Sequence, residues 1–353
     1  MTTSTPAYDP SAHRANSPSA QKRKAIVHLG LNKTGSTSIQ TWLRTNKSAL
    51  LKQGFHYDPF EDGKHPQWPH ADVIAIASLN SDDPDLLSAF RLSYGIRTPE
   101  EYNNQSQLMK TAFANSLSEA GDRTVILSSE TLGVWATGTG LVGPVCEFLR
   151  KYFDEFTIVT YVREQADWLA SAYSQAVKIG RFHSIKAFAA ARGENNYDQF
   201  ASTWSQAAEP HGSVVMRLFE RETMINNDVV EDFAVTCGID TRGLTKVRAH
   251  NEAISANEVR VLELLSRLEK RLVQLPFAPR SRHRKIARLF KGRRKFSLSK
   301  SMTRRIRALN AESNEQFRQR YFPDRPVLFA TLNPREDGVA QRVVTKKIAK
   351  PHT

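Results

Sequence analysis

Residues 26–38 read IVHLGLNKTGSTS, and this segment decides the fold that the sequence predicts. Its first four residues form an apolar run that suits a buried strand, and a helical spacing of apolar residues begins at Ile39. A loop that contains Gly30 and Gly35 joins the two. Glycines let a backbone approach an anion closely, and the first N–H groups of a helix favour negative charge. The segment therefore predicts a phosphate-binding strand, loop and helix.

The position of the lysine distinguishes this loop from that of a nucleoside triphosphatase. Gly30 and Gly35 have the offset of a Walker A loop, but Ser36 and Thr37 stand where such a protein has Lys-Ser or Lys-Thr. The lysine lies earlier, at Lys33. Because glycine and serine turns between a strand and a helix are common without any ligand, a second motif is needed to decide the matter.

The segment Lys33–Thr37, KTGST, resembles the 5′-phosphosulfate loop of sulfotransferases that use 3′-phosphoadenosine 5′-phosphosulfate (PAPS). The longer segment 28–40, HLGLNKTGSTSIQ, is most similar to the bacterial, carbohydrate-type branch of that family. The resemblance implies that Lys33 is the catalytic cation at the bridging oxygen. It also implies that the 5′ end of PAPS is bound by Lys33, Thr34, Gly35, Ser36, Thr37 and Ser38.

Arg163 and Ser171 form the second motif. They lie in the segment 162–173, VREQADWLASAY, just after an apolar, β-branched run. This segment resembles the 3′-phosphate-binding part of PAPS sulfotransferases, in which an arginine at a strand end and a serine on the next helix hold the phosphate. Arginine suits that role because its planar donors bind phosphate with two hydrogen bonds. An arginine and a serine eight residues apart indicate nothing by themselves. Arg163 and Ser171 become informative because a loop that resembles the 5′-phosphosulfate loop precedes them in the chain.

Strand patterns and helical patterns alternate along the chain. Further strand patterns lie at 54–57, 123–130, 156–163 and 214–219, and helical patterns lie between them. Such alternation implies right-handed crossovers and parallel strands. We therefore predict an α/β fold, a P-loop-type three-layer α/β/α domain with a central, mostly parallel sheet and additional C-terminal helices.

The composition along the chain predicts four segments. Residues 1–23 are polar, hold almost no large apolar side chain, and are expected to be a disordered tail. We expect the sulfotransferase-like P-loop domain at 24–275 and a basic helical extension, packed on the same domain, at 276–333. Residues 334–353 form a polar and basic tail.

Two residues are candidates for the general base. Glu130 follows the strand pattern where cytosolic sulfotransferases, by the order of elements, present a catalytic histidine, and some carbohydrate sulfotransferases use a glutamate. His70 has the more suitable intrinsic pKa, about 6.5. We prefer Glu130 because a strand end faces the ligand crevice of an open α/β sheet. Ser129 and His28 are further candidates, and a purely structural role of Glu130 stays open.

The formal net charge is +14, and one segment accounts for nearly all of it. The segment from Arg280 to Arg307 is rich in Lys and Arg and contains no Asp or Glu, while apolar residues recur in it at helical intervals. This pattern is typical of a basic amphipathic helix pair. We expect an anionic acceptor or a peripheral membrane contact there; nucleic acid is the less favoured partner, because aromatic residues are not interleaved with the charges.

The remaining composition limits the chemistry. Cys146 and Cys237 stand far from any CxxC or Cys/His spacing, and the spacing of the histidines 56, 65 and 70 matches no standard metal motif, so no metal is expected. The chain has no apolar run of membrane-spanning length and no apolar leader, so we expect a soluble, cytoplasmic protein.

These observations favour transfer of a sulfuryl group from PAPS to a hydroxyl, on a carbohydrate or glycolipid acceptor that the sequence does not identify. Two alternatives remain open at this point. A P-loop nucleotide or small-molecule kinase would share the fold but needs a lysine directly after Gly35 and a strand-end aspartate for magnesium. Binding of nucleic acid or of an anionic membrane by a non-enzymatic protein would account for the basic segment 280–307 but not for the loop at 30–38.

Overall fold

The structure is a computed structural model that describes residues 22–57, 74, 77–78, 96–130, 132–179, 184–247, 254–271 and 280–330. His70, the tail at 334–353 and nearly all of 1–23 lie outside these residues. The chain divides into two compact units, 1–161 with 200–249 and 162–199 with 250–353. Within the described ranges, no helix is both long and apolar enough to cross a membrane.

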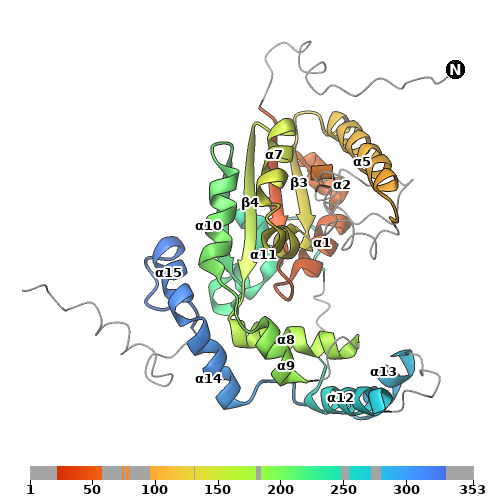
Figure 1. The fold of residues 1–353 in the computed structure, drawn as a ribbon. Coiled ribbons are helices and arrows are strands. Elements are labelled where there is room, and N and C mark those ends of the chain that lie inside the picture. Colours follow the sequence, from red (N-terminus) through yellow and green to blue (C-terminus); the bar gives the residue numbers. More distant parts are fainter. Residues whose placement is uncertain are drawn as a thin grey trace, which may run out of the picture. The chain divides into compact units, whose positions relative to one another are not determined.

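The first unit is built on a five-stranded sheet in the order β2-β3-β1-β4-β5. β1 pairs in parallel with β3 and β4, and β2 pairs in parallel with β3; Figure 1 shows the β3 and β4 arrows pointing the same way. The strands are β1 (Lys24–Leu29), β2 (Phe55–Tyr57), β3 (Thr124–Ser129), β4 (Glu155–Val162) and β5 (Gly212–Leu218). The predicted α/β class with a central, mostly parallel sheet and added C-terminal helices is confirmed.

Helices of the first unit follow the strands. They are α1 (Ser36–Thr45), α2 (Lys47–Lys52), α5 (Pro99–Ala120), a π-helical turn (Leu132–Ala136), α6 (Thr137–Thr139), α7 (Val142–Tyr152), α10 (Tyr197–Ala208), two 3₁₀ turns (Arg221–Thr223 and Ile225–Asn227) and α11 (Val229–Thr236). The polar residues before α5 form its start. Thr98 and Glu101 form a reciprocal capping box, and Pro99 takes the first helical position.

The core of this unit explains why β1 is a continuous apolar run. All of Ala25–Leu29 is buried, because helices cover both faces of a central parallel strand. On one face, the side chains of β1 and β4 pack with Trp42 of α1 and Phe233 of α11. Helices α1 and α11 therefore lie together on that face, next to the loop that follows β1.

The second unit is helical. It comprises α8 (Gln165–Lys178), α9 (Ile185–Arg192), α12 (Ala256–Arg271), α13 (Arg280–Leu289), α14 (Lys300–Leu309) and α15 (Ala311–Tyr321), together with the start of α10. Gln165 and Asn314 exchange two amide hydrogen bonds of 2.7 and 3.0 Å. The buried Asn310 donates to the Gly193 carbonyl at 2.8 Å. These contacts hold α14 and α15 to α8 and to the end of α9.

The two units are interleaved in sequence, whereas we expected a domain at 24–275 and an extension at 276–333. The basic helices α13 and α14 pack with α8, α9 and α12 through one apolar cluster that includes Ala287 and Ile306. A division by contacts does not test which segments fold together, so the predicted domain boundaries stay a prediction.

Candidate functional site

The loop after β1 is closed so tightly that its first residue must be glycine. Gly30 donates its N–H to the Ser129 carbonyl at 2.9 Å and so continues the pairing of β1 with β3. A Cβ atom at this position would lie 2.6 Å from Ser36 Oγ and 3.2 Å from Glu130 Cγ. The loop, the start of α1 and the end of β3 are therefore in direct contact.

Gly35 is required by both conformation and space. It is the N-cap of α1 and adopts φ 84° and ψ 8°, a left-handed conformation that disfavours other residues. A Cβ atom there would lie 2.9 Å from Val229 Cγ1 and 3.0 Å from Phe219 Cε2. The beginning of α11 and the residue after β5 thus support the loop from the other side.

Hydrogen bonds within the loop leave a defined set of backbone donors. The Thr34 and Ser36 hydroxyls both donate to the Leu31 carbonyl, at 2.6 and 3.2 Å. The N–H groups of Thr34 and Ser38 are also used, by the carbonyls of Leu31 and Gly35 at 3.3 and 2.9 Å. The N–H groups of residues 35–37 lie at the very start of α1. Because no helical turn precedes them, there is no carbonyl of the same helix to which they could donate.

The start of α1 has the properties of an anion site. No side chain caps this helix, and its first turn contains no acidic residue. An uncapped helix start combines free N–H groups with the positive end of the helix dipole. The backbone N–H groups of Gly35, Ser36 and Thr37 are therefore better suited to an anion than the Ser36 hydroxyl, which donates its one proton inside the loop.

Lys33 lies in the same loop, half-buried, with φ 69°. For a residue with a Cβ atom the left-handed region costs roughly 1–2 kcal/mol. Strain of this kind persists where the surrounding structure imposes it, and it is frequent at ligand sites. The conformation of Lys33 is a consequence of the tight turn between Gly30 and the buried Thr34.

Glu130 is the candidate base that the structure brings to this loop. It is half-buried at the end of β3, beside Gly30, and the π-helical turn begins two residues later. Ser129 is buried, and its hydroxyl accepts the Leu132 N–H at 3.2 Å. Ser129 therefore organises the backbone after β3, and Glu130 is the ionisable side chain at this strand end.

His28 has a structural environment. Its ring is fully buried, and burial lowers its pKa to about 3. Nδ1 lies 2.8 Å from Ser128 Oγ, and the ring contacts Phe233 and Tyr161 edge-on. A histidine that stays neutral inside an apolar cluster is poorly suited to exchange protons with a substrate.

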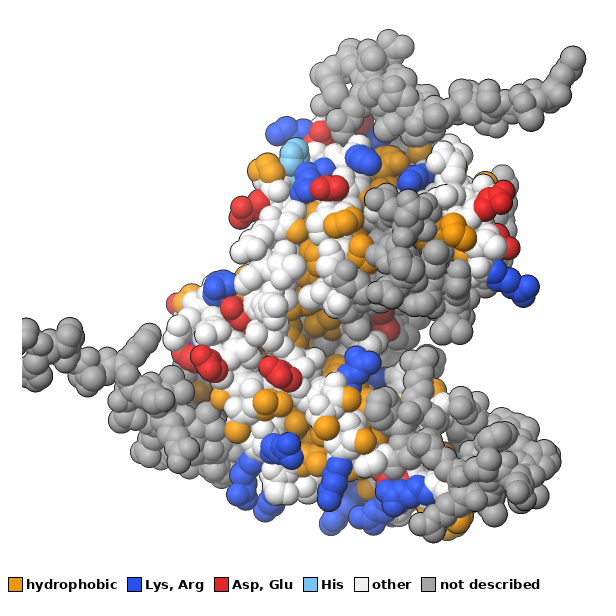
Figure 2. Space-filling model, in the orientation of Figure 1, with side chains coloured by type: hydrophobic (Ala, Val, Ile, Leu, Met, Phe, Trp, Pro, Cys, Tyr) orange, Lys and Arg blue, Asp and Glu red, His pale blue; other side chains and the backbone are white. Residues whose placement is uncertain are grey.

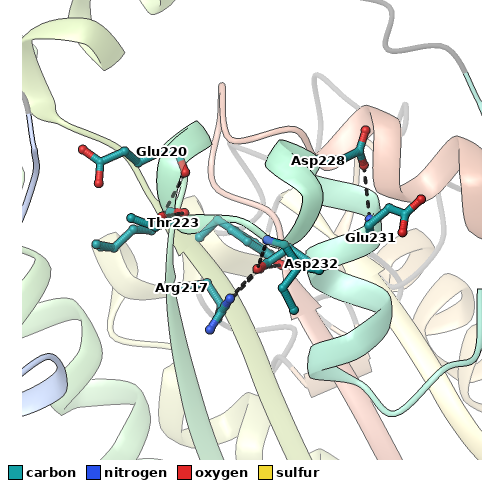
Figure 3. A network of polar contacts seen from close by, with 9 residues as sticks. Arg217, Glu220, Thr223, Asp228, Glu231 and Asp232 are labelled. Atoms are coloured by element: carbon teal, nitrogen blue, oxygen red, sulfur yellow. Dashed lines mark hydrogen bonds and ion pairs between the residues drawn. The ribbon is translucent and has the colours of Figure 1, made fainter.

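A buried polar network under α11 was not predicted from the sequence. Figure 3 shows Arg217 of β5 and Asp232 of α11 pointing toward one another. The Asp232 carboxylate, fully buried, accepts from Arg217 Nε at 2.9 Å, from Tyr161 Oη at 2.7 Å and from the Ile225 N–H at 3.1 Å. The network fixes α11, whose first residue, Val229, touches the loop at Gly35. An aspartate within the apolar face of a helical pattern was the signal that could have revealed it.

Arg163 and Ser171 lie in the second unit. Arg163 comes directly after β4, its carbonyl accepts the Tyr197 hydroxyl at 2.6 Å, and burial lowers the pKa of its guanidinium. Glu164 caps α8 by accepting the Asp167 N–H at 2.9 Å and lies 3.4 Å from Arg307 Nε. Ser171 is half-buried on α8, two turns after Glu164 and on the same face of the helix.

The predicted site residues thus fall into two groups. The loop 30–38 and Glu130 are brought together in the first unit, and Arg163 stands at the head of the helix that carries Ser171 in the second. His70 lies outside the described residues. In the part of the chain that the structure describes, no three His, Cys, Asp or Glu residues are close enough to hold a metal ion; the expectation of no metal stays a prediction.

Comparisons with known proteins were made on sequence and structure. No family model matches the chain. An uncharacterized protein from Archaeoglobus fulgidus is 32% identical over 175 residues, which cover 47% of this chain and 45% of that protein, so the chain spans less than half of this relative's length.

Two solved structures are similar, and both are of sulfotransferases. A sulfotransferase from Alicyclobacillus acidocaldarius is 16% identical with a TM-score of 0.35, over 75% of this chain and 99% of that one. The sulfotransferase domain of an olefin synthase from Synechococcus is 14% identical with a TM-score of 0.30, over 77% and 96%. Likeness at these scores does not establish an activity for this chain.

Proposed function

We propose that this protein is a sulfotransferase that moves a sulfuryl group from PAPS to a hydroxyl of a carbohydrate or glycolipid, as in the bacterial, carbohydrate-type branch that its sequence resembles. One observation carries the proposal. The uncapped start of α1, with the N–H groups of residues 35–37, follows a loop whose lysine is Lys33 and whose glycines leave no room for a side chain.

The first unit suits the 5′ end of the donor. PAPS, when bound, supplies an activated sulfuryl group on a 5′-phosphate. The backbone of residues 35–37 would hold that phosphate, because N–H groups at a helix start donate to the two non-bridging, anionic oxygens of the phosphate. Lys33 would neutralise the charge that develops on the bridging oxygen as the bond from sulfur to that oxygen breaks. Thr34 and Ser38 shape the loop through their bonds to Leu31 and Gly35.

Glu130 would accept the proton of the attacking hydroxyl. It stands at the rigid end of β3 and next to Gly30, on the side of the loop where the sheet ends. As the acceptor oxygen bonds to sulfur in line with the leaving phosphate, its proton passes to the Glu130 carboxylate. His70 remains the alternative base, and Glu130→Gln compared with His70→Ala distinguishes the two.

Arg163 and Ser171 would bind the 3′-phosphate, which distinguishes PAPS from other adenine nucleotides. The Arg163 guanidinium is half-buried, and partial burial strengthens a charge-assisted bond to an incoming anion. Ser171 adds one hydroxyl donor from α8. This assignment rests on the sequence motif and on the position of Arg163 directly before α8 and of Ser171 within that helix.

Ligand stabilisation tests the proposal against a kinase. A ligand that binds only the folded state raises its stability by about 2.7 kcal/mol at a hundred times its Kd. Adenosine 3′,5′-bisphosphate should raise the midpoint of thermal unfolding, and ATP with magnesium should not. The opposite ranking would indicate a P-loop kinase and overturn the assignment. Incubation with sulfur-labelled PAPS and a panel of glycans, glycolipids and small alcohols then identifies the acceptor by the fraction that gains the label.

A further inference from the structure

The α13 helix carries an apolar face that the second unit does not cover. Ala287 is buried against Val259 and Leu262 of α12. Ile286, Leu289 and Phe290 follow the i, i+3, i+4 spacing of a neighbouring helical face, and they are 40, 84 and 54% exposed. Folding has therefore used only part of the apolar surface of this helix.

The neighbouring helix α12 repeats the feature. Leu264 and Leu268, spaced i, i+4, are 57 and 44% exposed. Isolated exposed apolar residues are common on protein surfaces, whereas groups of two or three at helical spacing on adjacent helices are less usual and call for an explanation.

The same unit carries many exposed basic residues. Figure 2 shows Lys and Arg side chains gathered over α9, α12 and α14. No described acidic side chain forms an ion pair with any of the exposed basic residues of the segment, which are Lys285, Arg288, Lys291, Arg293, Arg294, Lys295, Lys300, Arg304 and Arg305. Like charges at this density repel one another, and an anionic surface would relieve the repulsion.

We propose that Ile286 and Leu289 of α13 and Phe290 directly after it dock, together with the basic residues Lys285, Arg288 and Lys291 of the same segment, on the surface of an anionic lipid bilayer. The basic residues indicate that the partner is negatively charged. The exposed apolar side chains indicate that the partner also has an apolar interior that they can enter. A helix that lies in a bilayer interface places apolar side chains at the level of the acyl chains and keeps Lys and Arg at the headgroups.

Nucleic acid fits the same surface less well. The phosphate backbone of a nucleic acid would attract the positive charges, but it provides no apolar surface for Ile286 and Leu289 to contact. Single strands are held by stacked aromatic side chains, and Phe290 is the one aromatic residue of this face. A bilayer accounts for the charge and the exposed aliphatic side chains together.

Vesicle sedimentation with the full chain tests the proposal. Vesicles of phosphatidylcholine alone are compared with vesicles in which about a third of the lipid is phosphatidylserine, an anionic lipid. The protein should sediment with the anionic vesicles only, and added salt should weaken the binding, because attraction to the anionic surface is screened. Failure to bind anionic vesicles, or equal binding to both kinds, overturns the proposal.

Two matched pairs of variants locate the contact. Lys285→Gln/Arg288→Gln/Lys291→Gln should weaken binding on the order of 10²-fold, since each basic residue contributes about fivefold near an anionic surface. Its control, Lys52→Gln/Lys151→Gln/Arg221→Gln, removes the same charge from exposed positions of the first unit and should leave binding nearly unchanged. Equal losses in the two variants would mean that only net charge matters and would overturn the assignment to α13.

The apolar pair separates a bilayer from other partners. Leu289→Ser/Phe290→Ser should weaken vesicle binding at least about tenfold, because partition of the two side chains is lost. Leu108→Ser/Val235→Ser, at 52 and 53% exposed positions of the first unit, is its control. Two results would overturn the proposal. The first is that an oligonucleotide competes with vesicles for the protein and binds the Leu289→Ser/Phe290→Ser variant with unchanged affinity. The second is that the wild-type protein is a dimer and that this variant is a monomer. The readouts do not involve sulfate transfer, so failure here leaves the proposed activity untouched.

Discussion

Glu130 lies against Gly30, so closely that a Cβ atom at position 30 would be 3.2 Å from Glu130 Cγ. The Glu130 side chain at the end of β3 and the loop after β1 therefore lie together in the first unit. Both belong to strand ends that the β1–β3 pairing aligns, Leu29 opposite Ser129. In an open α/β sheet, that edge is where ligands bind.

Replacement of Glu130 by Gln should reduce turnover about 10²–10⁴-fold, because the amide keeps the shape but cannot accept a proton. Binding of adenosine 3′,5′-bisphosphate should be unchanged in the variant. The comparison is His70→Ala, for which we expect a smaller loss, both measured at saturating PAPS. The reverse ranking would assign the base to His70.

Gly35→Ala should weaken nucleotide binding and destabilise the first unit. The change opposes the left-handed conformation and places a methyl group 2.9 Å from Val229, so the start of α1 must shift. Gly238→Ala is the matched control, because Gly238 has φ 71° and a methyl group added there would meet no atom within 4 Å. Calorimetry should show a lost affinity for the bisphosphate in the first variant only.

Lys33→Ala should lower turnover on the order of 10²–10³-fold by removing a charge from the transition state. Lys33→Gly removes the same charge and relaxes a φ of 69°, so it should lose turnover equally while unfolding at a temperature no lower than that of the wild type. Near-wild-type turnover in either variant would show that Lys33 is not catalytic.

Arg163→Ala should weaken binding of adenosine 3′,5′-bisphosphate but leave binding of AMP, which lacks the 3′-phosphate, nearly unchanged. Ser171→Ala should give the same selectivity with a smaller loss, since it removes one neutral hydrogen bond of about 1 kcal/mol. If calorimetry shows equal losses for both nucleotides, Arg163 has a structural role at the start of α8.

The stability of the protein should fall with pH below about 6.5 because of His28. Burial lowers the pKa of His28 to about 3 in the folded state, whereas the unfolded chain titrates near about 6.5. Between these values the unfolded state binds the additional proton, so stability decreases as pH falls, by up to about 1.4 kcal/mol per pH unit.

Denaturant unfolding between about pH 7 and pH 5 measures this slope. His28→Leu should remove it and keep a partner for Ser128, whose hydroxyl still accepts from Gln40 Nε2 at 3.2 Å. His211→Gln, at an exposed position, is the control and should keep the wild-type slope. An unchanged slope in His28→Leu would show that other groups cause the pH dependence.

The local elements could be predicted because their signals are local. The apolar run before Gly30, the glycines of the loop and the helical spacing from Ile39 each depend on a few neighbouring residues, and the structure has the strand and helix where the sequence indicated them. The same holds for the strand that ends beside Glu130. The amphipathic pattern in the basic segment likewise predicted helices, and α13 and α14 are found there.

The position of Asp232 in an apolar helical face hinted at a buried carboxylate, but its partners Arg217 and Tyr161 could not be predicted from the sequence. The three residues come from three elements, and the partner of a buried charge depends on which strands and helices the topology brings together. The assignment of Ser129 and His28 to structural roles had the same origin, since burial and hydrogen-bond partners decide whether a hydroxyl or an imidazole can react.

By itself the sequence determined the strand, loop and helix at 26–45 and the basic amphipathic character of 280–307, because propensity, glycine conformation and charge pattern are properties of short segments. Only the tertiary structure decided that the Ser36 hydroxyl is used inside the loop, that Glu130 touches Gly30 and that α13 leaves Leu289 uncovered. Those facts depend on packing between segments distant in sequence, where the space and the hydrogen-bond partners available to each side chain are set by its neighbours.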